Sequence, residues 1–144
     1  MDELLIWAPE EVLGHLRKID AATKAHQRWE DIDNWYYYGG VLVLGYEMFR
    51  SIIDNKKKTG QDAAPINEDQ HAQVKMQLTE GPNIIIADEA HKMKNAASGI
   101  AMAASLFRSR SRIALTGSPL ANNVEEYHTM VCISIRLALI FQLL

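Results

Sequence analysis

Three short runs of mainly apolar residues divide the chain. They lie at 41–44, 84–87 and 112–115, and each is followed by polar or glycine-containing residues and then by a helical pattern. Runs without strict alternation are typical of strands buried on both faces of a parallel sheet. Strands that alternate with helices predict an α/β fold, in which ligands bind at the carboxyl ends of the strands.

Helices are predicted between these runs from their first residues and their apolar stripes. Pro9, followed by two glutamates, begins the first helix, and its inward stripe consists of Val12, Leu16 and Ile19. A second helix follows Gly45. Its expected inward-facing residues are Phe49 and either Ile52 or Ile53.

Asparagines are predicted to cap the remaining helices. Asn67 precedes an acidic first turn, and a Gly-Pro pair ends that helix. Asn95 is expected to cap a helix over residues 96–107. Asn123 is expected to cap the last helix, with Glu126 placed to return a hydrogen bond.

Composition and charge exclude several classes of protein. The 144 residues are 48% hydrophobic and 23% charged, which is typical of a globular domain, and the net charge of −3 gives no basic footprint. Cys132 is the only cysteine, which argues against a disulfide-stapled secreted fold. The apolar stretch at 131–144 is short and carries Arg136, so we expect no membrane partner. An intracellular protein is the default expectation.

Two adjacent carboxylates form the clearest chemical feature. The apolar run at 84–87 leads directly into Asp88 and Glu89, followed by an alanine and His91. Magnesium is usually held by one or two carboxylates together with waters and substrate phosphates. In phosphate cleavage one carboxylate can position the metal and the other can activate the attacking water. The alternative is a pair of solvated acids at a strand end, because short motifs often match by chance.

A hydroxyl-bearing turn follows the third apolar run. The sequence Leu-Thr-Gly-Ser-Pro-Leu at 115–120 places Thr116 and Ser118 around a glycine, with a proline restricting the turn. By itself this pattern predicts only a strand-ending turn. However, only one crossover helix separates this turn from the acidic strand, so the turn can lie beside Asp88 and Glu89.

These motifs, in this order, resemble the Swi/Snf-type ATPases of the superfamily-two helicases. Residues 88–95 resemble motif II and residues 115–123 resemble motif III. Residues 39–50 are similar to the strand and helix that precede motif II. Residues 126–131 point more narrowly to the ATRX-like branch, and the resemblance extends over about 35–131.

The resemblance implies a RecA-like parallel sheet with helices on both faces, and a role for each motif residue. Asp88 would coordinate Mg²⁺, Glu89 would activate the hydrolytic water, and both would contact ATP. His91 would link the ATP site to motif III or to the second lobe; its alternative is a turn histidine. Thr116 and Ser118 would couple hydrolysis to movement.

The function implied by the resemblance is that of an ATP-dependent DNA translocase and chromatin remodeller of the nucleus. Members of the family hydrolyse ATP to move along double-stranded DNA and to slide or displace nucleosomes or other DNA-bound proteins. Residues 45–50 would lie near the DNA backbone, unless their aromatic side chains belong to the core. Two alternatives remain: a helicase of another superfamily-two branch, or a non-catalytic truncated binding fragment.

The sequence departs from the family pattern in one serious way. It contains no Gly-x-x-x-x-Gly-Lys-Ser/Thr loop, whose backbone amides and lysine cradle the phosphates of the nucleotide. A second RecA-like lobe is absent from the sequence as well. We therefore expect the isolated chain to be inactive as an ATP hydrolase. Serine stands at position 118 where the family usually has threonine, which keeps the hydroxyl.

The domain organisation predicted from sequence is a single partial lobe. Residues 1–131 form this amino-terminal RecA-like lobe, with a solvated loop or insertion at 55–70. Residues 132–144 form an anomalous apolar tail. The Val-Cys pair at 131–132 can be encoded by nucleotides that resemble a fungal intron donor. We therefore hypothesise that the tail is mistranslated intron; the alternative is a natural terminal helix.

Overall fold

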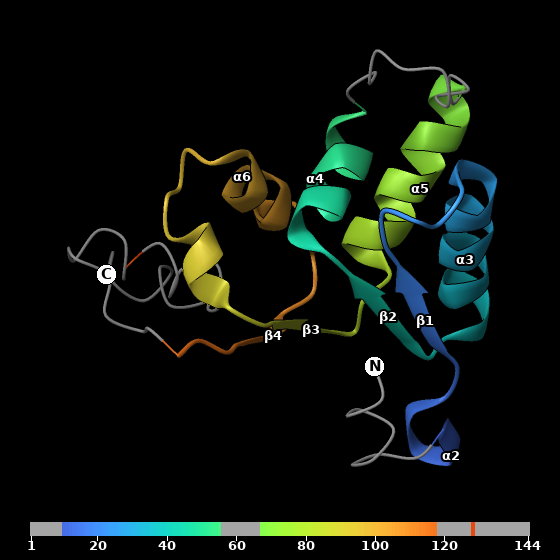
Figure 1. Cartoon of the computed structure of the whole chain (residues 1–144), viewed down its shortest axis with the longest axis horizontal. Helices are drawn as coiled ribbons and strands as arrows, with labels where there is room; N and C mark the ends of the chain where they lie inside the picture. Colours follow the sequence, from blue (N-terminus) through green and yellow to red (C-terminus); the bar gives the residue numbers. More distant parts are fainter. Residues whose placement is uncertain (1–9, 56–66, 118–127, 129–144) are drawn as a thin grey trace, which may run out of the picture. The chain divides into compact units, whose positions relative to one another are not determined.

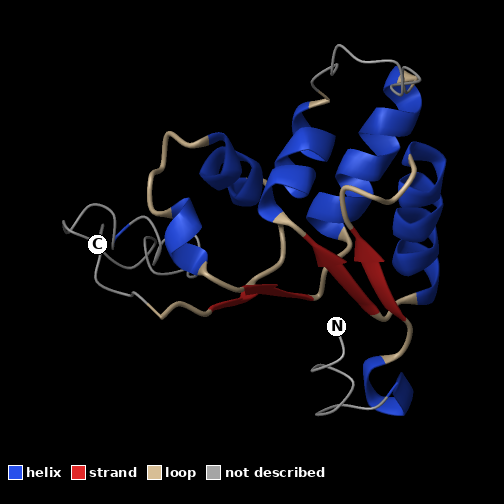
Figure 2. Ribbon diagram, in the orientation of Figure 1, coloured by secondary structure: helices blue, strands red, loops and turns tan. Residues whose placement is uncertain are grey.

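The computed structural model of the chain describes residues 10–55, 67–117 and residue 128. In these residues short parallel strands alternate with helices (Figures 1 and 2). The chain divides into an N-terminal unit, Met1–Leu78, and a C-terminal unit, Thr79–Leu144. Within the described residues, no helix has the length and apolar character needed to cross a membrane.

The N-terminal unit contains one parallel pair of strands. Leu16 of the first strand lies opposite Val41 of the second, and Ile19 lies opposite Leu44. The elements in chain order are α2 (Glu10–Leu13), β1 (Leu16–Ile19), α3 (Ala25–Tyr38), β2 (Val41–Leu44), α4 (Tyr46–Asp54) and α5 (Glu68–Glu80), the last of which continues into the C-terminal unit.

Helix α5 lies between α3 and α4 (Figure 1). It makes polar contacts with both helices. The Gln77 side-chain amide donates to Asp33 Oδ1 at 2.6 Å, and His71 Nε2 lies 2.9 Å from the Ile52 carbonyl oxygen. Gln77 is only 1% exposed, and its Oε1 atom has no hydrogen-bond partner. Among the described residues of this unit, the buried apolar ones are Ile19, Ile32, Phe49, Ile52, Ile53, Val74 and Leu78.

Two glycines make the turn from α3 into β2. Gly39 has φ 74° and Gly40 has φ 95°, which L-residues with side chains rarely adopt. A Cβ atom on Gly40 would lie 2.3 Å from the His15 carbonyl oxygen. The turn is also bonded by side chains, since Arg17 donates to the Gly39 carbonyl at 3.1 Å and Trp35 to the Gly40 carbonyl at 3.2 Å.

The C-terminal unit contains a second parallel pair of strands. Ile84 lies opposite Ser111 and Ala87 opposite Ala114. The elements are β3 (Ile84–Ala87), the 3₁₀ helix η1 (Ala90–Met93), α6 (Gly99–Ser105) and β4 (Ser111–Ala114). The buried apolar residues that we find here are Ala90, Met93, Ala101, Ala103 and Ala104.

One face of the β3–β4 pair carries exposed apolar side chains. Ile84 and Ile86 alternate along β3, and Ile113 and Leu115 alternate along β4 and the residue after it. All four are at least 43% exposed. The sequence prediction that these strands are buried on both faces is therefore wrong for this pair, because neither apolar pattern nor parallel pairing reveals whether a covering layer is present.

The α/β class and the positions of the apolar strands are confirmed. The strands predicted at 41–44 and 84–87 are present, and the strand predicted at 112–115 is shifted by one residue. The described strands form two separate parallel pairs, consistent with an incomplete RecA-like lobe. Helix α4 buries Phe49, as predicted, together with both of the alternatives, Ile52 and Ile53.

The predicted ends of α5 are also confirmed. The Asn67 side chain accepts from the Asp69 N–H at 3.3 Å, and its carbonyl accepts from His71 N–H at 3.0 Å. The helix ends at Glu80, before the Gly-Pro pair. The loop or insertion predicted at 55–70 is shorter than expected at its carboxyl end, because residues 68–70 belong to α5; residues 56–66 lie outside the described part.

The predicted first helix is wrong in its second half. Leu16 and Ile19, assigned to a helical stripe with Val12, belong to β1 instead. Gly14 adopts φ 69° after α2 ends at Leu13, so the backbone leaves the helix there. The i, i+4 spacing of the apolar residues was therefore coincidental.

The cap predicted for the 96–107 helix is displaced. The Asn95 side chain accepts from the Ala97 N–H at 2.9 Å, which closes a turn rather than a helix. Ser98 is the N-cap of α6 and accepts from the Ala101 N–H at 3.1 Å. The predicted Asn123 cap and the tail at 132–144 lie outside the described residues.

Candidate active site at the ends of β3 and β4

Two backbone hydrogen bonds continue the pairing of β3 and β4 beyond the strands. The Leu115 N–H donates to the Ala87 carbonyl at 2.8 Å, and the Ala90 N–H donates to the Leu115 carbonyl at 2.9 Å. The turn that follows β3 is therefore fixed against the residue that follows β4. This brings residues 88–91 and 115–117 of the two sequence motifs to one edge of the sheet.

Asp88 and Glu89 are both exposed at this edge. Asp88 Oδ1 accepts from the Glu89 N–H at 2.9 Å. Glu89 has the left-handed backbone conformation, with φ 51° and ψ 46°, which is uncommon for a residue with a side chain and is often found at functional sites. Because both side chains reach solvent, neither carboxylate needs a metal ion to offset a cost of burial.

His91 connects the acidic turn to the hydroxyl turn. Its Nδ1 atom lies 3.1 Å from Glu89 Oε2 and 3.2 Å from Thr116 Oγ1. The structure thus brings Asp88, Glu89, His91 and Thr116 together, as the sequence predicted. Ser118 lies outside the described residues.

The contact between Glu89 and His91 could not be predicted from sequence. Side chains two positions apart do not face each other on a helix. Here Glu89 precedes η1 in a left-handed conformation, which redirects the chain between the two residues. Only a residue preference for positive φ could have signalled this, and glutamate has none.

The carboxylates are suited to magnesium but not to an all-protein metal cage. The described residues contain no group of three or more histidine, cysteine, aspartate or glutamate side chains that could hold a metal. Mg²⁺ needs fewer protein ligands, since waters and nucleotide phosphates complete its octahedral shell. Asp88, exposed at the strand end, therefore fits the chemistry of a magnesium ligand in the presence of a nucleotide.

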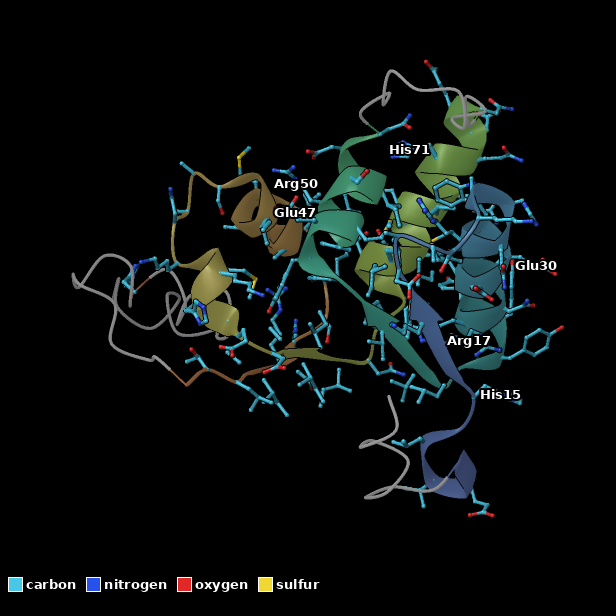
Figure 3. The ribbon with its side chains drawn as sticks, in the orientation of Figure 1. His15, Arg17, Glu30, Glu47, Arg50 and His71 are labelled. Carbon is cyan, nitrogen blue, oxygen red and sulfur yellow. The ribbon has the colours of Figure 1, made fainter. Side chains whose placement is uncertain are left out.

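The segment predicted to approach DNA forms the first part of α4 in the N-terminal unit. Phe49 is 7% exposed, so this aromatic residue belongs to the core, as the alternative interpretation held. Arg50 Nη2 pairs with Glu47 Oε2 at 2.9 Å, and both side chains, labelled in Figure 3, are partly exposed. Arg50 is thus the residue of this segment with a cationic group near solvent.

Comparison with known proteins identifies the family. A model of the SNF2-related domain matches residues 1–137, so the chain belongs to the SNF2-related family. It is 38% identical over 101 residues to the Transcriptional regulator ATRX homolog of Drosophila melanogaster. This alignment covers 69% of this chain and 7% of that protein.

Two human proteins show similar relationships. Identity to the Transcriptional regulator ATRX is 38% over 100 residues, covering 69% of this chain and 4% of that protein. Identity to Helicase ARIP4 is 33% over 144 residues, covering 85% of this chain and 10% of that protein. These relatives support the ATRX-like branch of the Swi/Snf proteins. The chain spans a tenth or less of the length of each of them.

Proposed function

We propose that this chain is part of the first motor lobe of an ATP-dependent DNA translocase that remodels chromatin in the nucleus. The observation that carries the proposal is the joining of motifs II and III through His91, whose Nδ1 atom is within 3.2 Å of Thr116. Such a contact offers a route by which events at a nucleotide can reach the neighbouring strand end. Membership of the SNF2-related family supports the same function.

The motif residues act on ATP in distinct ways. Asp88 would hold Mg²⁺ when a nucleotide is bound, and the ion would supply positive charge near the phosphates. Glu89 orients the attacking water and accepts its proton. Thr116 passes the change to the strand end through its contact with His91. We propose the same coupling role for Ser118 from its place in the sequence motif.

The proposed partners are double-stranded DNA and nucleosomes or other DNA-bound proteins. The names of two relatives, a transcriptional regulator and a helicase, are consistent with that class of partner. In the N-terminal unit Arg50 is the candidate for a phosphate contact. Such contacts give affinity without sequence specificity, so binding should weaken as salt is raised.

A non-catalytic binding fragment is the second candidate. Asp88 and Glu89 are both exposed, and the sequence lacks a phosphate-binding loop. Both observations are consistent with a solvated turn that has no catalytic role. Titration of the chain with Mg-ATP separates the two ideas. Binding that depends on Asp88 favours the motor lobe, whereas the absence of binding together with retained DNA or protein binding favours the second candidate.

The decisive experiment replaces Glu89 by Gln in a longer translation product that contains this chain and hydrolyses ATP. Because the amide keeps the shape but cannot take the water's proton, we expect hydrolysis to fall by about 10²–10⁴-fold while ATP binding stays nearly unchanged. Glu68→Gln, at an exposed position of α5, is the matched control and should retain activity.

The same assay tests the choice of nucleic acid. Stimulation of hydrolysis by double-stranded DNA supports the translocase. Stimulation by RNA alone would indicate a helicase of another branch, and unchanged hydrolysis in Glu89→Gln would remove this residue from the mechanism.

A further inference from the structure

The last turn of helix α3 presents aromatic rings to solvent. Tyr37 and Tyr38 end the helix and are 66% and 76% exposed. The ring of Tyr36 packs edge-on against that of Tyr37, with the two centroids 5.4 Å apart. Because each residue turns the helix by about 100°, Tyr37 and Tyr38 both point well away from the direction of Ile32, the buried residue of α3. Exposed tyrosine rings of this kind are typical anchors of protein–protein contacts.

Two carboxylates share this side of the helix with the tyrosines. Glu30 and Asp31 precede Tyr37 and Tyr38 by seven residues each, which is nearly two full turns, so each carboxylate lies in line with one ring. Glu30 is exposed and lies on the outer side of α3 in Figure 3, and Asp31 is half-buried. We call these four residues the outer face of α3.

The cationic groups nearest to this face are engaged elsewhere. Arg28 is the only lysine or arginine within α3, and its guanidinium donates to the Thr23 and Ala21 carbonyls, at 2.6 Å and 3.3 Å, before the helix begins. Arg17 donates to the Gly39 carbonyl, after the helix ends. In the part of the chain that the structure describes, no ion pair engages Glu30 or Asp31. The outer face is therefore aromatic and negatively charged, and the carboxyl end of the helix adds to that charge.

We propose that the outer face of α3 binds a basic, arginine-rich peptide segment of a partner protein. A guanidinium group can pair with a carboxylate, and it can also lie flat over a tyrosine ring. Each carboxylate and its tyrosine are about 10 Å apart along the helix, a distance that about three residues of an extended peptide cover.

Charge complementarity selects this occupant over others. An apolar partner would take Glu30 and Asp31 out of water without a counter-charge, and a nucleic acid would be repelled by them. The inference goes beyond the proposed function and does not depend on it. No residue of the outer face belongs to the acidic turn or to the hydroxyl turn.

The test is a titration of the whole 144-residue chain against a fluorescent peptide of alternating arginine and glycine. The control peptide has citrulline, which is uncharged and similar in shape, in place of each arginine. Fluorescence anisotropy gives the affinity, and changes in backbone amide spectra locate the site. Amide spectra of each variant without peptide establish that it is folded. We expect the arginine peptide to bind, the citrulline peptide to bind much more weakly, and the shifts to centre on α3.

Neutral variants test the carboxylates. Glu30→Gln combined with Asp31→Asn should weaken binding of the arginine peptide by about three- to tenfold. The matched control, Glu68→Gln combined with Asp69→Asn, removes the same charge from exposed positions in the first turn of α5 and should leave the affinity nearly unchanged.

Ring variants test the tyrosines by a readout that net charge does not move. Tyr37→Ser and Tyr38→Ser should each weaken binding by about two- to fivefold, because the ring face is lost. Tyr37→Phe and Tyr38→Phe keep the ring and should bind as the parent chain does.

Four results would overturn the inference. The citrulline peptide could bind as well as the arginine peptide, or the two double variants could lose the same affinity, which would indicate net charge alone. The serine variants could bind like the parent chain. Sedimentation could also show that the chain associates with itself through this face, with the association lost in Tyr37→Ser combined with Tyr38→Ser, and the occupant would then be a second copy.

Discussion

At the scale of single residues, Gly39 and Gly40 differ in what surrounds their missing side chains. Both have positive φ, but a Cβ atom would meet nothing within 4 Å at Gly39 and the His15 carbonyl oxygen at 2.3 Å at Gly40. We expect Gly39→Ala to cost about 1–3 kcal/mol through backbone strain alone. Gly40→Ala should cost clearly more, because the clash involves backbone that cannot rotate away.

Denaturant unfolding of the two alanine variants measures this difference, with Gly39→Ala as the control for strain. Equal losses of unfolding free energy in the two variants would contradict the close approach of Gly40 to His15.

Asp20 supplies a pH-dependent interaction at the end of β1. The Lys18 ammonium, 3.0 Å away, and a hydrogen bond from the Ala22 N–H lower the pKa of Asp20 from its ordinary value of 3.8. A lowered folded-state pKa contributes stability that is present above 3.8 and is lost as the pH falls through the folded value. The effect is small, because the Asp20 side chain is 44% exposed and solvent screens its charge.

The Asp20→Asn variant keeps the hydrogen-bond acceptor and removes the charge. We expect the melting temperatures of the parent chain and the variant to differ slightly at pH 6 and to converge as the pH falls below 3.8. Added salt should also reduce the difference. A difference that is constant with pH would show that charge on Asp20 is not involved.

The sequence predicted which described residues lie close together in the candidate site, but not their exposure or backbone conformation. Strand order and motif spacing were enough to place Thr116 near the acidic turn, because parallel strands end at the same edge. The exposure of Asp88 and the left-handed backbone of Glu89 could not be predicted. Both depend on local backbone geometry that no apolar pattern encodes.

At the scale of elements, α3 and α5 are joined by two glutamines that donate to the same oxygen. Gln77 and Gln73 lie 2.6 Å and 3.2 Å from Asp33 Oδ1, but Gln77 is buried and Gln73 is exposed. We expect Gln77→Glu to destabilise the protein by about 3 kcal/mol, because it places a second carboxylate against Asp33 away from water. Gln73→Glu, the matched control, should cost less than about 1 kcal/mol.

Unfolding free energies of both variants provide the measurement. The penalty in Gln77→Glu should shrink below about pH 4, where one carboxyl group becomes protonated and can donate to the other. A similar cost for the two substitutions, or a penalty that does not respond to acid, would show that burial of Gln77 does not control this contact.

Elements were predictable from sequence where their apolar residues were contiguous. The runs of β2 and β3 consist entirely of apolar residues, and both strands were found. Strand β1 mixes leucine and isoleucine with two basic residues, so it was read as helix. Helix α3 was not predicted, since Ile32 is the only residue of the helix that is fully buried and no apolar stripe marks it.

At the scale of the whole chain, we expect the purified 144-residue protein to show no measurable ATP hydrolysis, with or without DNA. The sequence lacks the phosphate-binding loop that would contribute to transition-state contacts, and the described acidic turn alone cannot replace it. A phosphate-release assay with Mg-ATP measures this. Magnesium-dependent turnover that Glu89→Gln abolishes would show that the remaining residues suffice.

The long sequence separation within the β3–β4 pair has a consequence during synthesis. Ile84 pairs with Ser111, so β3 leaves the ribosome before its partner exists. At about 5–20 residues per second, the intervening stretch takes roughly 1–5 s to translate. For that time Ile84 and Ile86 are exposed on a strand with unpaired edges, and even the finished pair leaves them open to solvent. A nascent chain at this stage is a natural client for chaperones that bind short apolar segments.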